Sequence, residues 1–445
     1  MSEFDVVAVL TTMAALFAWI NHRWFHLPTT IGLLAISLLL SVALVALGRA
    51  GLAPVDTFLQ FVSAIDFDEA LIHGMLGALL FAGALHVDLD ELLRQKGVIA
   101  LLATVGVVIS TCVVGLLAHL LFGAFGFDVP LLVCFLFGAI VSPTDPIAVG
   151  AILRKAGVPR TLLTKITGES LFNDGLGVVF FLLLLQLAFG GAAISVLDAS
   201  RLLAVEVLGG VAYGALAGWL AYRMLRSVDH YTVEILITLA LVTGGYALAS
   251  RLHVSGPLAM VVAGLLLGNR GRSLAMTEST RQRLDGFWEL VDEFLNAVLF
   301  VIIGVEVVAV DFAEPVLLAS VLAIPAVLFA RWVSVALPVT ALRQLRTFSP
   351  HVVTVLTWSG LKGGISVALA LSLPAGPHRS LIVTATYIVV CFSILVQGLT
   401  VGPLVARLLR STRTEGDAGP TGATPSGGPL LSPRGGRTPK RDVTQ

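Results

Sequence analysis

The stretch that decides the fold is residues 134–153, which read CFLFGAIVSPTDPIAVGAIL. It is apolar and long enough to cross a bilayer as one helix, which takes roughly 20 residues. Pro143 and Pro146 nevertheless flank Thr144 and Asp145 in its middle. Proline blocks a helix locally, and a broken backbone at membrane depth is tolerated only where it lines a cavity or is buried in protein. The stretch therefore predicts an interrupted membrane helix with freed, ion-coordinating carbonyl groups; a plain proline kink is the weaker alternative.

A second interrupted stretch lies late in the chain, where residues 357–373 read TWSGLKGGISVALALSL. Three glycines loosen this helix around Lys362. Paired interrupted helices at matching places in two halves of a membrane protein indicate a binding site. Asp145 and Lys362 carry opposite charges, which suits opposite dipole ends of half-helices.

A third stretch, residues 167–181, reads TGESLFNDGLGVVFF and gathers its polar side chains on one helical face. Glu169, Ser170, Asn173 and Asp174 form this strip, and the opposite face is apolar. Their oxygen atoms are the ligands that hard cations such as Na⁺ and Li⁺ prefer. The alternative is a buried polar network that holds helices together, and Glu169 is the member that fits it.

A single arginine, Arg331, lies in the middle of another apolar stretch. A fixed charge at this depth needs a buried partner, and Glu169 is the expected one. Arg331 would otherwise have to reach the membrane interface, from which its mid-span position separates it.

Composition limits the class of protein. The 445 residues are 57% apolar and 13% charged, against about 25% charged in a soluble domain, so we predict a polytopic membrane protein rather than a soluble enzyme. Because 28 basic residues balance 28 acidic ones, a nucleic-acid partner is not expected. The three cysteines lie far apart and form no metal-binding motif, which also argues against a disulfide scaffold.

Thirteen apolar stretches are expected to span the membrane, and their loop charges predict the orientation. Fifteen Lys and Arg residues fall in loops on one side and four on the other, so the positive-inside rule places the N-terminus outside and the C-terminus in the cytoplasm. The acidic leader before the first span fits a retained, uncleaved helix. The predicted spans are 5–21, 29–48, 69–87, 97–123, 130–153, 162–189, 202–222, 232–250, 255–269, 287–309, 316–341, 350–373 and 381–409.

These spans make residues 1–410 one transmembrane domain. Residues 411–445 differ because they are rich in glycine, proline and basic residues. Such a segment buries too little apolar area to order itself, so we predict a disordered cytoplasmic tail.

Three motifs occurring in order carry a resemblance to a known family. SPTDPIAVGAI (142–152), GESLFNDG (168–175) and GLKGGISVALALSLP (360–374) are similar to the NhaP-type Na⁺/H⁺ antiporters of the monovalent cation:proton antiporter superfamily. The resemblance covers about residues 5–409. It implies thirteen helices with inverted repeats, crossed discontinuous helices, a core domain and a dimerisation domain. It also implies a homodimer. The short loops and the uncleaved first helix fit an inner cell membrane, and no cofactor is expected.

The resemblance also assigns roles to residues. Asp174 matches the aspartate that alternately binds cation and proton, and Asn173 the asparagine before it. Asp145, Thr144 and Ser170 match further cation-site residues, Thr144 through its backbone carbonyl. Glu169 and Arg331 match a structural ion pair, and Lys362 occupies a basic position that often holds arginine.

One departure concerns the stretch LLFAGALHVDL (79–89), where some relatives have an acidic residue and this chain has Ala82. The resemblance therefore implies a cation site with one protein ligand fewer, and leaves the affinity and selectivity for the cation open.

The expected function is exchange of Na⁺ or Li⁺ for H⁺ through competition for Asp174. Because Asn173 replaces a second acid, charge counting predicts an electroneutral 1:1 exchange. A K⁺/H⁺ antiporter on the same scaffold is the nearest alternative. Asp145 and Asp174 could also imitate the pair of an intramembrane aspartyl protease, but that explains neither Arg331 nor the second interrupted helix. A channel is disfavoured because no repeated selectivity element occurs.

Overall fold

The computed structural model describes residues 3–50, 74–155, 158, 160–190, 196–271, 278–344, 348 and 351–417. Within these ranges the chain forms helices joined by turns and contains no strand, so the predicted all-α class is confirmed there. The start of the predicted span 69–87 and the tail beyond residue 417 lie outside the described residues.

The helices follow the apolar stretches of the sequence. Each predicted span overlaps either one helix or two consecutive helices separated by a break or a short helical turn. Their bounds are α1 (Glu3–Ile20), α2 (Thr29–Arg49), α5 (Leu76–Leu85), α6 (Leu89–Leu101), α7 (Val107–Ala124), α8 (Leu131–Ile140), α9 (Pro146–Lys155), α10 (Arg160–Phe189), α11 (Val196–Leu225), α12 (Tyr231–Arg251), α13 (Gly256–Leu266), α15 (Glu278–Val305), α16 (Glu314–Leu342), α17 (Val352–Trp358), α18 (Gly364–Leu371), α19 (Arg379–Phe392) and α20 (Gly398–Asp417). Short helical turns extend several of them: η1 (Asn21–Phe25), η3 (Leu102–Gly106), η4 (Leu267–Gly271), η5 (Glu306–Ala309) and η6 (Ser393–Gln397).

Among the described residues, eight helical stretches are long and apolar enough to cross a membrane. They are Phe4–Phe25, Thr29–Gly48, Leu89–Ala124, Thr161–Phe189, Leu197–Leu225, Tyr231–Arg251, Glu314–Leu342 and Arg379–Leu408. Shorter apolar helices, including α5 and α8, lie between them. The chain is thus a multi-pass membrane protein, and the number of thirteen crossings stays a prediction.

Two helices are interrupted where the sequence predicts it. α8 ends at Ile140 and α9 begins at Pro146, so the prolines separate two half-helices. α17 ends at Trp358 and α18 begins at Gly364, so the glycine-rich segment forms the second break. Both breaks lie inside the protein, since the residues from Val141 to Thr144 and from Ser359 to Gly364 are buried.

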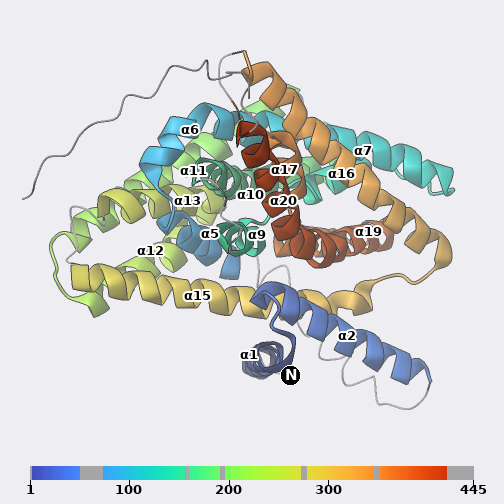
Figure 1. The fold of residues 1–445 in the computed structure, drawn as a ribbon, viewed down its shortest axis with the longest axis horizontal. Helices are drawn as coiled ribbons and strands as arrows, with labels where there is room; N and C mark the ends of the chain where they lie inside the picture. The colour runs from blue at the N-terminus through green and yellow to red at the C-terminus, as the bar shows by residue number, and fades with distance from the viewer. Residues whose placement is uncertain are drawn as a thin grey trace, which may run out of the picture.

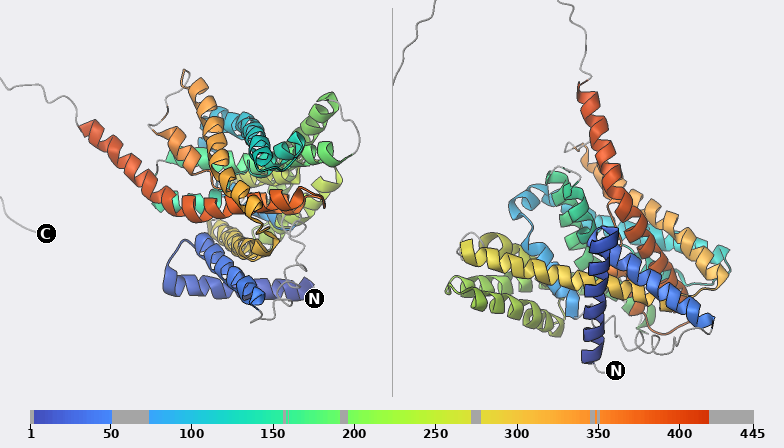
Figure 2. Two further views of the ribbon diagram at one scale, coloured as in Figure 1. Left: turned by 90° about the vertical axis from the view of Figure 1, so that its right-hand side faces the viewer. Right: turned by 60° about the horizontal axis from the view of Figure 1, so that its bottom comes forward.

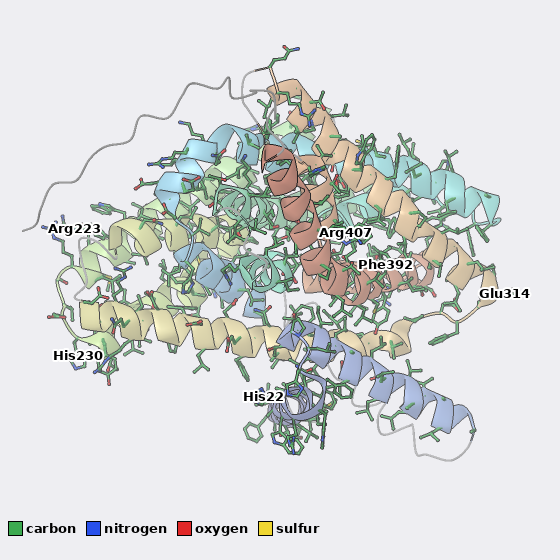
Figure 3. All side chains as sticks on the ribbon, in the orientation of Figure 1. His22, Arg223, His230, Glu314, Phe392 and Arg407 are labelled. Atoms are coloured by element: carbon green, nitrogen blue, oxygen red, sulfur yellow. The ribbon has the colours of Figure 1, made fainter. Side chains whose placement is uncertain are left out.

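Helices distant in sequence enclose these breaks. α16 packs against α7, α17 and α19, and α10 packs against α6 and α8. On the other side, α15 packs against α2 and α5, and in Figure 1 it runs along the lower part of the molecule below the labels of α5 and α9. Arg223 and His230, which flank the α11–α12 turn, lie at one end of the view, and Glu314 lies at the other end (Figure 3).

The last described helix crosses the boundary predicted at residue 410. α20 continues to Asp417, so residues 411–417 are helical where the sequence predicts disorder. No proline interrupts this segment before Pro420, and the helix can therefore propagate past the apolar stretch. Figure 2 shows α20 running out of the helical body.

Candidate functional site

The two breaks meet in the middle of the fold. The backbone N–H of Asp145 donates to the carbonyl oxygen of Leu361 at 2.7 Å, which joins one break to the other. The ammonium group of Lys362 donates to the carbonyl oxygens of Ser142 (3.0 Å) and Pro143 (3.3 Å). These carbonyls follow the C-terminal end of α8, where the helix dipole favours a positive charge. Lys362 therefore caps the first half-helix.

Asp145 occupies the complementary place at the second break. A Cβ atom built on Gly363 would lie 2.5 Å from Oδ2 of Asp145, so this carboxylate lies against the backbone that opens α18. A helix N-terminus favours a negative charge, as its C-terminus favours a positive one. Each break therefore contributes a charged side chain to the other. Lys362 of the α17–α18 break lies at the C-terminal end of α8, and Asp145 of the α8–α9 break lies at the N-terminal end of α18.

Thr144 is held in the first break by two side chains of α10. Asn173 accepts from the backbone N–H of Thr144 (3.2 Å) and donates through Nδ2 to its hydroxyl oxygen (2.9 Å). The hydroxyl groups of Thr144 and Ser170 are also hydrogen-bonded at 2.9 Å. Because Thr144 lies outside both half-helices, its backbone has no helical hydrogen-bond partners, and these bonds fix the segment instead.

A cavity of ≈ 50 Å³ adjoins this segment. A water molecule needs roughly 10–15 Å³ of such space, so the cavity can hold a cation with some of its water. Asp174 reaches it from α10; its side chain is 4% exposed, and its Oδ1 has no hydrogen-bond partner. The lining residues are Leu76, Leu79, Leu80, Gly83, Pro143, Thr144, Asp145, Leu171, Asp174, Asn296, Leu299, Gly363, Gly364, Ile365 and Ser366.

Glu169 and Arg331 form a buried ion pair beside the site. The two Nη atoms of Arg331 donate to the two carboxylate oxygens of Glu169, at 2.5 and 3.0 Å, and Nη2 also donates to the carbonyl of Leu356 (3.2 Å). Glu169 is 1% exposed and Arg331 7% exposed. This bidentate geometry ties α10 to α16 and α17, in the charge-assisted form that suits arginine.

The structure separates the predicted site residues into two groups. Thr144, Asp145 and Asp174 line the cavity, whereas Ser170 and Asn173 lie behind Thr144 and do not line it. Glu169, Arg331 and Lys362 also lie outside the cavity wall, in the contacts described above. Among the described residues, no three His, Cys, Asp or Glu side chains gather as a resident metal site would require.

Two polar residues of the cavity wall were not predicted from sequence. Asn296 reaches the cavity from α15 and Ser366 from α18. The available signal was weak: each is one of several polar residues in its stretch, and nothing in the sequence distinguishes it from the others. Ala82, at the place where some relatives were expected to carry an acid, is buried in the hydrophobic cluster between α5 and α13 and does not line the cavity.

Comparison with known proteins identifies a matching family. The profile of the family described as "Sodium/hydrogen exchanger, transmembrane" matches residues 11–407. The chain is 48% identical over 409 residues to the Na(+)/H(+) antiporter NhaP of Pseudomonas aeruginosa, covering 91% of this chain and 96% of that protein. It is 33% identical to the Na(+)/H(+) antiporter NhaH of Halobacillus dabanensis, covering 86% and 96%. These matches confirm the resemblance that the three motifs indicate.

A solved structure has the same fold. The sodium proton antiporter MjNhaP1 from Methanocaldococcus jannaschii superposes with a TM-score of 0.70 at 19% identity, covering 92% of this chain and all of the other. The shared architecture therefore extends over nearly the whole chain.

Proposed function

The chain belongs to the sodium/hydrogen exchanger family, and we propose that its exchange of Na⁺ for H⁺ operates by competition of the two ions for the carboxylate of Asp174. Membership makes the protein a secondary transporter of a monovalent cation and a proton within the membrane, and not an enzyme. We propose that no cofactor takes part, since Na⁺ or Li⁺ and H⁺ are the cargo.

The observation that carries this proposal is the buried carboxylate oxygen Oδ1 of Asp174, which has no hydrogen-bond partner and lies beside a cavity between two broken helices. A buried negative charge whose carboxylate oxygen has no hydrogen bond is unfavourable. A proton or a cation removes this penalty, and either one excludes the other from the same oxygen atoms. Mutual exclusion at one group is the minimum that an exchanger needs.

Asp145 and the carbonyl group of Thr144 complete the proposed cation ligands on the side of α8–α9. Oxygen ligands of this kind suit Na⁺ and Li⁺. Ser170 and Asn173 contribute by fixing Thr144, because their hydrogen bonds to it orient the unwound segment. Glu169 and Arg331 hold α10 against α16, and Lys362 holds the two breaks together.

The exchange is proposed to be electroneutral and 1:1. Asn173 precedes Asp174 where a second carboxylate would add a second titrating charge. A single carboxylate that carries either one proton or one monovalent cation moves no net charge per cycle.

The family architecture is proposed to extend to the finer features. These are thirteen crossings within residues 1–410, inverted repeats with crossed discontinuous helices, a core domain moving against a dimerisation domain, and a homodimer in the inner cell membrane. The meeting of the two breaks supports the crossed arrangement. The excess of basic residues in alternate loops supports a cytoplasmic C-terminus and an N-terminus outside.

Transport in proteoliposomes with an internal pH dye tests the function. An inward Na⁺ or Li⁺ gradient should alkalinise the lumen, K⁺ should not, and an imposed membrane potential should leave the rate unchanged. Asp174→Asn should abolish exchange while the protein elutes as a folded species. Asp128→Asn, which alters an exposed aspartate in the α7–α8 connection, is the matched control and should keep the rate.

Three outcomes would contradict the proposal. Full exchange by the Asp174→Asn variant would remove the assigned carboxylate. A response to K⁺ equal to that for Na⁺ would favour the K⁺/H⁺ alternative on this scaffold. A rate that follows the imposed potential would exclude 1:1 stoichiometry. An aspartyl protease using Asp145 and Asp174 is not favoured by the family match and would give no pH signal.

A further inference from the structure

Asn296 is a buried amide that no part of the mechanism above uses. It projects from α15, is 3% exposed, and lines the same cavity as Asp174. Its Nδ2 donates to the backbone carbonyl of Asp292 at 2.7 Å and to Oδ1 of that residue at 3.2 Å. Both partners are acceptors when the carboxylate is ionised, so the nitrogen must be the atom that faces them. The amide orientation is therefore fixed by its neighbours.

The other end of this amide is unsatisfied. Oδ1 of Asn296 is fully buried and makes no hydrogen bond, as is also true of Oδ1 of Asp174 on the cavity. Burying an acceptor without a partner costs about 1–3 kcal/mol, so such an atom in a folded protein requires a reason. An amide oxygen turned away from its nitrogen's partners, on a residue of the cavity wall, is a ready ligand for a cation inside the cavity.

α5, which packs against α15, supplies no such oxygen. The residues of α5 that line the cavity are Leu76, Leu79, Leu80 and Gly83, none of which has a side-chain oxygen. The known ligand candidates come from the α8–α9 break and from α10. α15 thus offers an oxygen from a helix that contributes none of them.

We propose that Oδ1 of Asn296 is a further ligand of the transported cation, and that Asp292 is a positioning residue that holds the amide with this oxygen toward the cavity. This inference rests on the proposed function, because the ligand acts on the cation bound at Asp174.

A neutral ligand has a distinct functional signature. An amide oxygen binds a cation but does not titrate, so it strengthens cation binding without adding a charge to the cycle. Its loss should weaken binding of Na⁺ and Li⁺ and leave proton binding to Asp174 in place. A residue that only supported the fold would instead lower the amount of stable protein and leave the KM for Na⁺ unchanged.

The first test is Asn296→Leu, which removes the oxygen at nearly constant volume. In proteoliposomes we expect the KM for Na⁺ to rise about tenfold with the maximal rate largely retained. In detergent, NaCl should raise the Tm of the unmodified protein more than that of this variant. Asn269→Leu is the matched control, because Asn269 bonds Val87, Leu89 and Leu265 away from the cavity. It should lower Tm and leave the KM for Na⁺ unchanged.

The second test is a double-mutant cycle with Asp292→Ala. If Asp292 acts through the amide, its removal should raise the KM for Na⁺, and the double variant should be no worse than Asn296→Leu alone. Equal KM values for Asn296→Leu and the unmodified protein would overturn the proposal, as would strictly multiplicative effects for the role of Asp292. Asp174→Asn measured in parallel separates the cases: if it still transports, the proposed function fails, whereas an inactive Asp174→Asn beside an unchanged Asn296→Leu refutes this inference alone.

Discussion

At the scale of single residues, Arg331 shows how a fixed charge is accommodated at membrane depth. Its guanidinium group donates hydrogen bonds to both carboxylate oxygens of Glu169 and to a backbone carbonyl oxygen. The buried charge is therefore stabilised by these hydrogen bonds as well as by the opposite charge of Glu169. Removal of one partner would leave the other charge buried and unpaired. That penalty is larger than the net contribution of the pair.

We therefore predict that Glu169→Gln or Arg331→Met lowers the free energy of unfolding by about 3–5 kcal/mol. Thermal unfolding of the purified protein in detergent measures the loss. Replacing both by Met should recover part of it, because no lone charge remains. Glu278→Gln, which breaks an exposed pair with Arg281 at 3.8 Å, is the control and should have little effect. Unchanged stability in both single variants would show that the pair is not structural.

Lys362 yields a second prediction at this scale. Its ammonium satisfies two carbonyl oxygens that the broken helix leaves free. Lys362→Met should lower both thermal stability and the exchange rate, because those oxygens stay buried without a donor. Lys362→Arg should keep most of both, since a guanidinium also donates to carbonyls. Rates and Tm values that are equal for the Met and Arg variants would refute this role.

At the scale of helices, the breaks depend on close backbone approach. Gly363 has an extended φ of −122°, so its glycine is required by space and not by backbone conformation. An added Cβ would lie 2.7 Å from the Cβ of Asp145, closer than side chains normally come. The second break can therefore accept Asp145 only because this position carries no side chain.

Gly363→Ala is accordingly expected to displace Asp145 and to lower the exchange rate on the order of tenfold, since small misplacements of site groups are costly. Proteoliposome transport at saturating Na⁺ measures the effect. Gly244→Ala on α12 meets no atom within 4 Å and should leave transport unchanged. If Gly363→Ala transported as fast as Gly244→Ala, the tight contact at the break would have no functional weight.

The sequence predicts these helices well because apolar length, proline and glycine act locally. Both breaks were predicted, and so was the pairing of Glu169 with Arg331, since few buried charges were available as partners. The site was less predictable. Which neighbour Lys362 bonds, and whether Asn296 faces the cavity, depends on how each helix is rotated and placed. That rotation is set by packing between segments distant in sequence.

The same reasoning explains why two residues predicted for the cation site, Ser170 and Asn173, do not line the cavity. Ser170 and Asn173 share the polar face of α10 with Asp174, and a helical projection cannot separate them. In the folded chain, Thr144 of the unwound segment lines the cavity and is hydrogen-bonded to both Ser170 and Asn173, which do not line it. A periodic pattern identifies the polar face of α10. The contacts of the unwound segment then decide which polar groups on that face reach the cavity.

At the scale of the whole molecule, α20 links the C-terminal region to the site. Val401 and Val405 are buried in the cluster that also holds Val149 of α9 and Leu361 of the second break. The family match ends at residue 407, within this helix. We therefore expect α20 to support both breaks, while the glycine- and proline-rich residues beyond it lie past the matched region.

Two truncations make this a prediction. A chain ending at Asp417 should keep the exchange rate and Tm, because it retains every described contact of α20. A chain ending at Gln397 should lose most exchange and unfold at lower temperature. The truncation exposes the apolar surface of α9 and removes Thr400, which accepts a hydrogen bond from Trp358. Proteoliposome transport and thermal unfolding of both chains decide the matter. Loss of exchange in the longer chain would show that the tail takes part in transport, and full exchange in the shorter one would show that the breaks hold without α20.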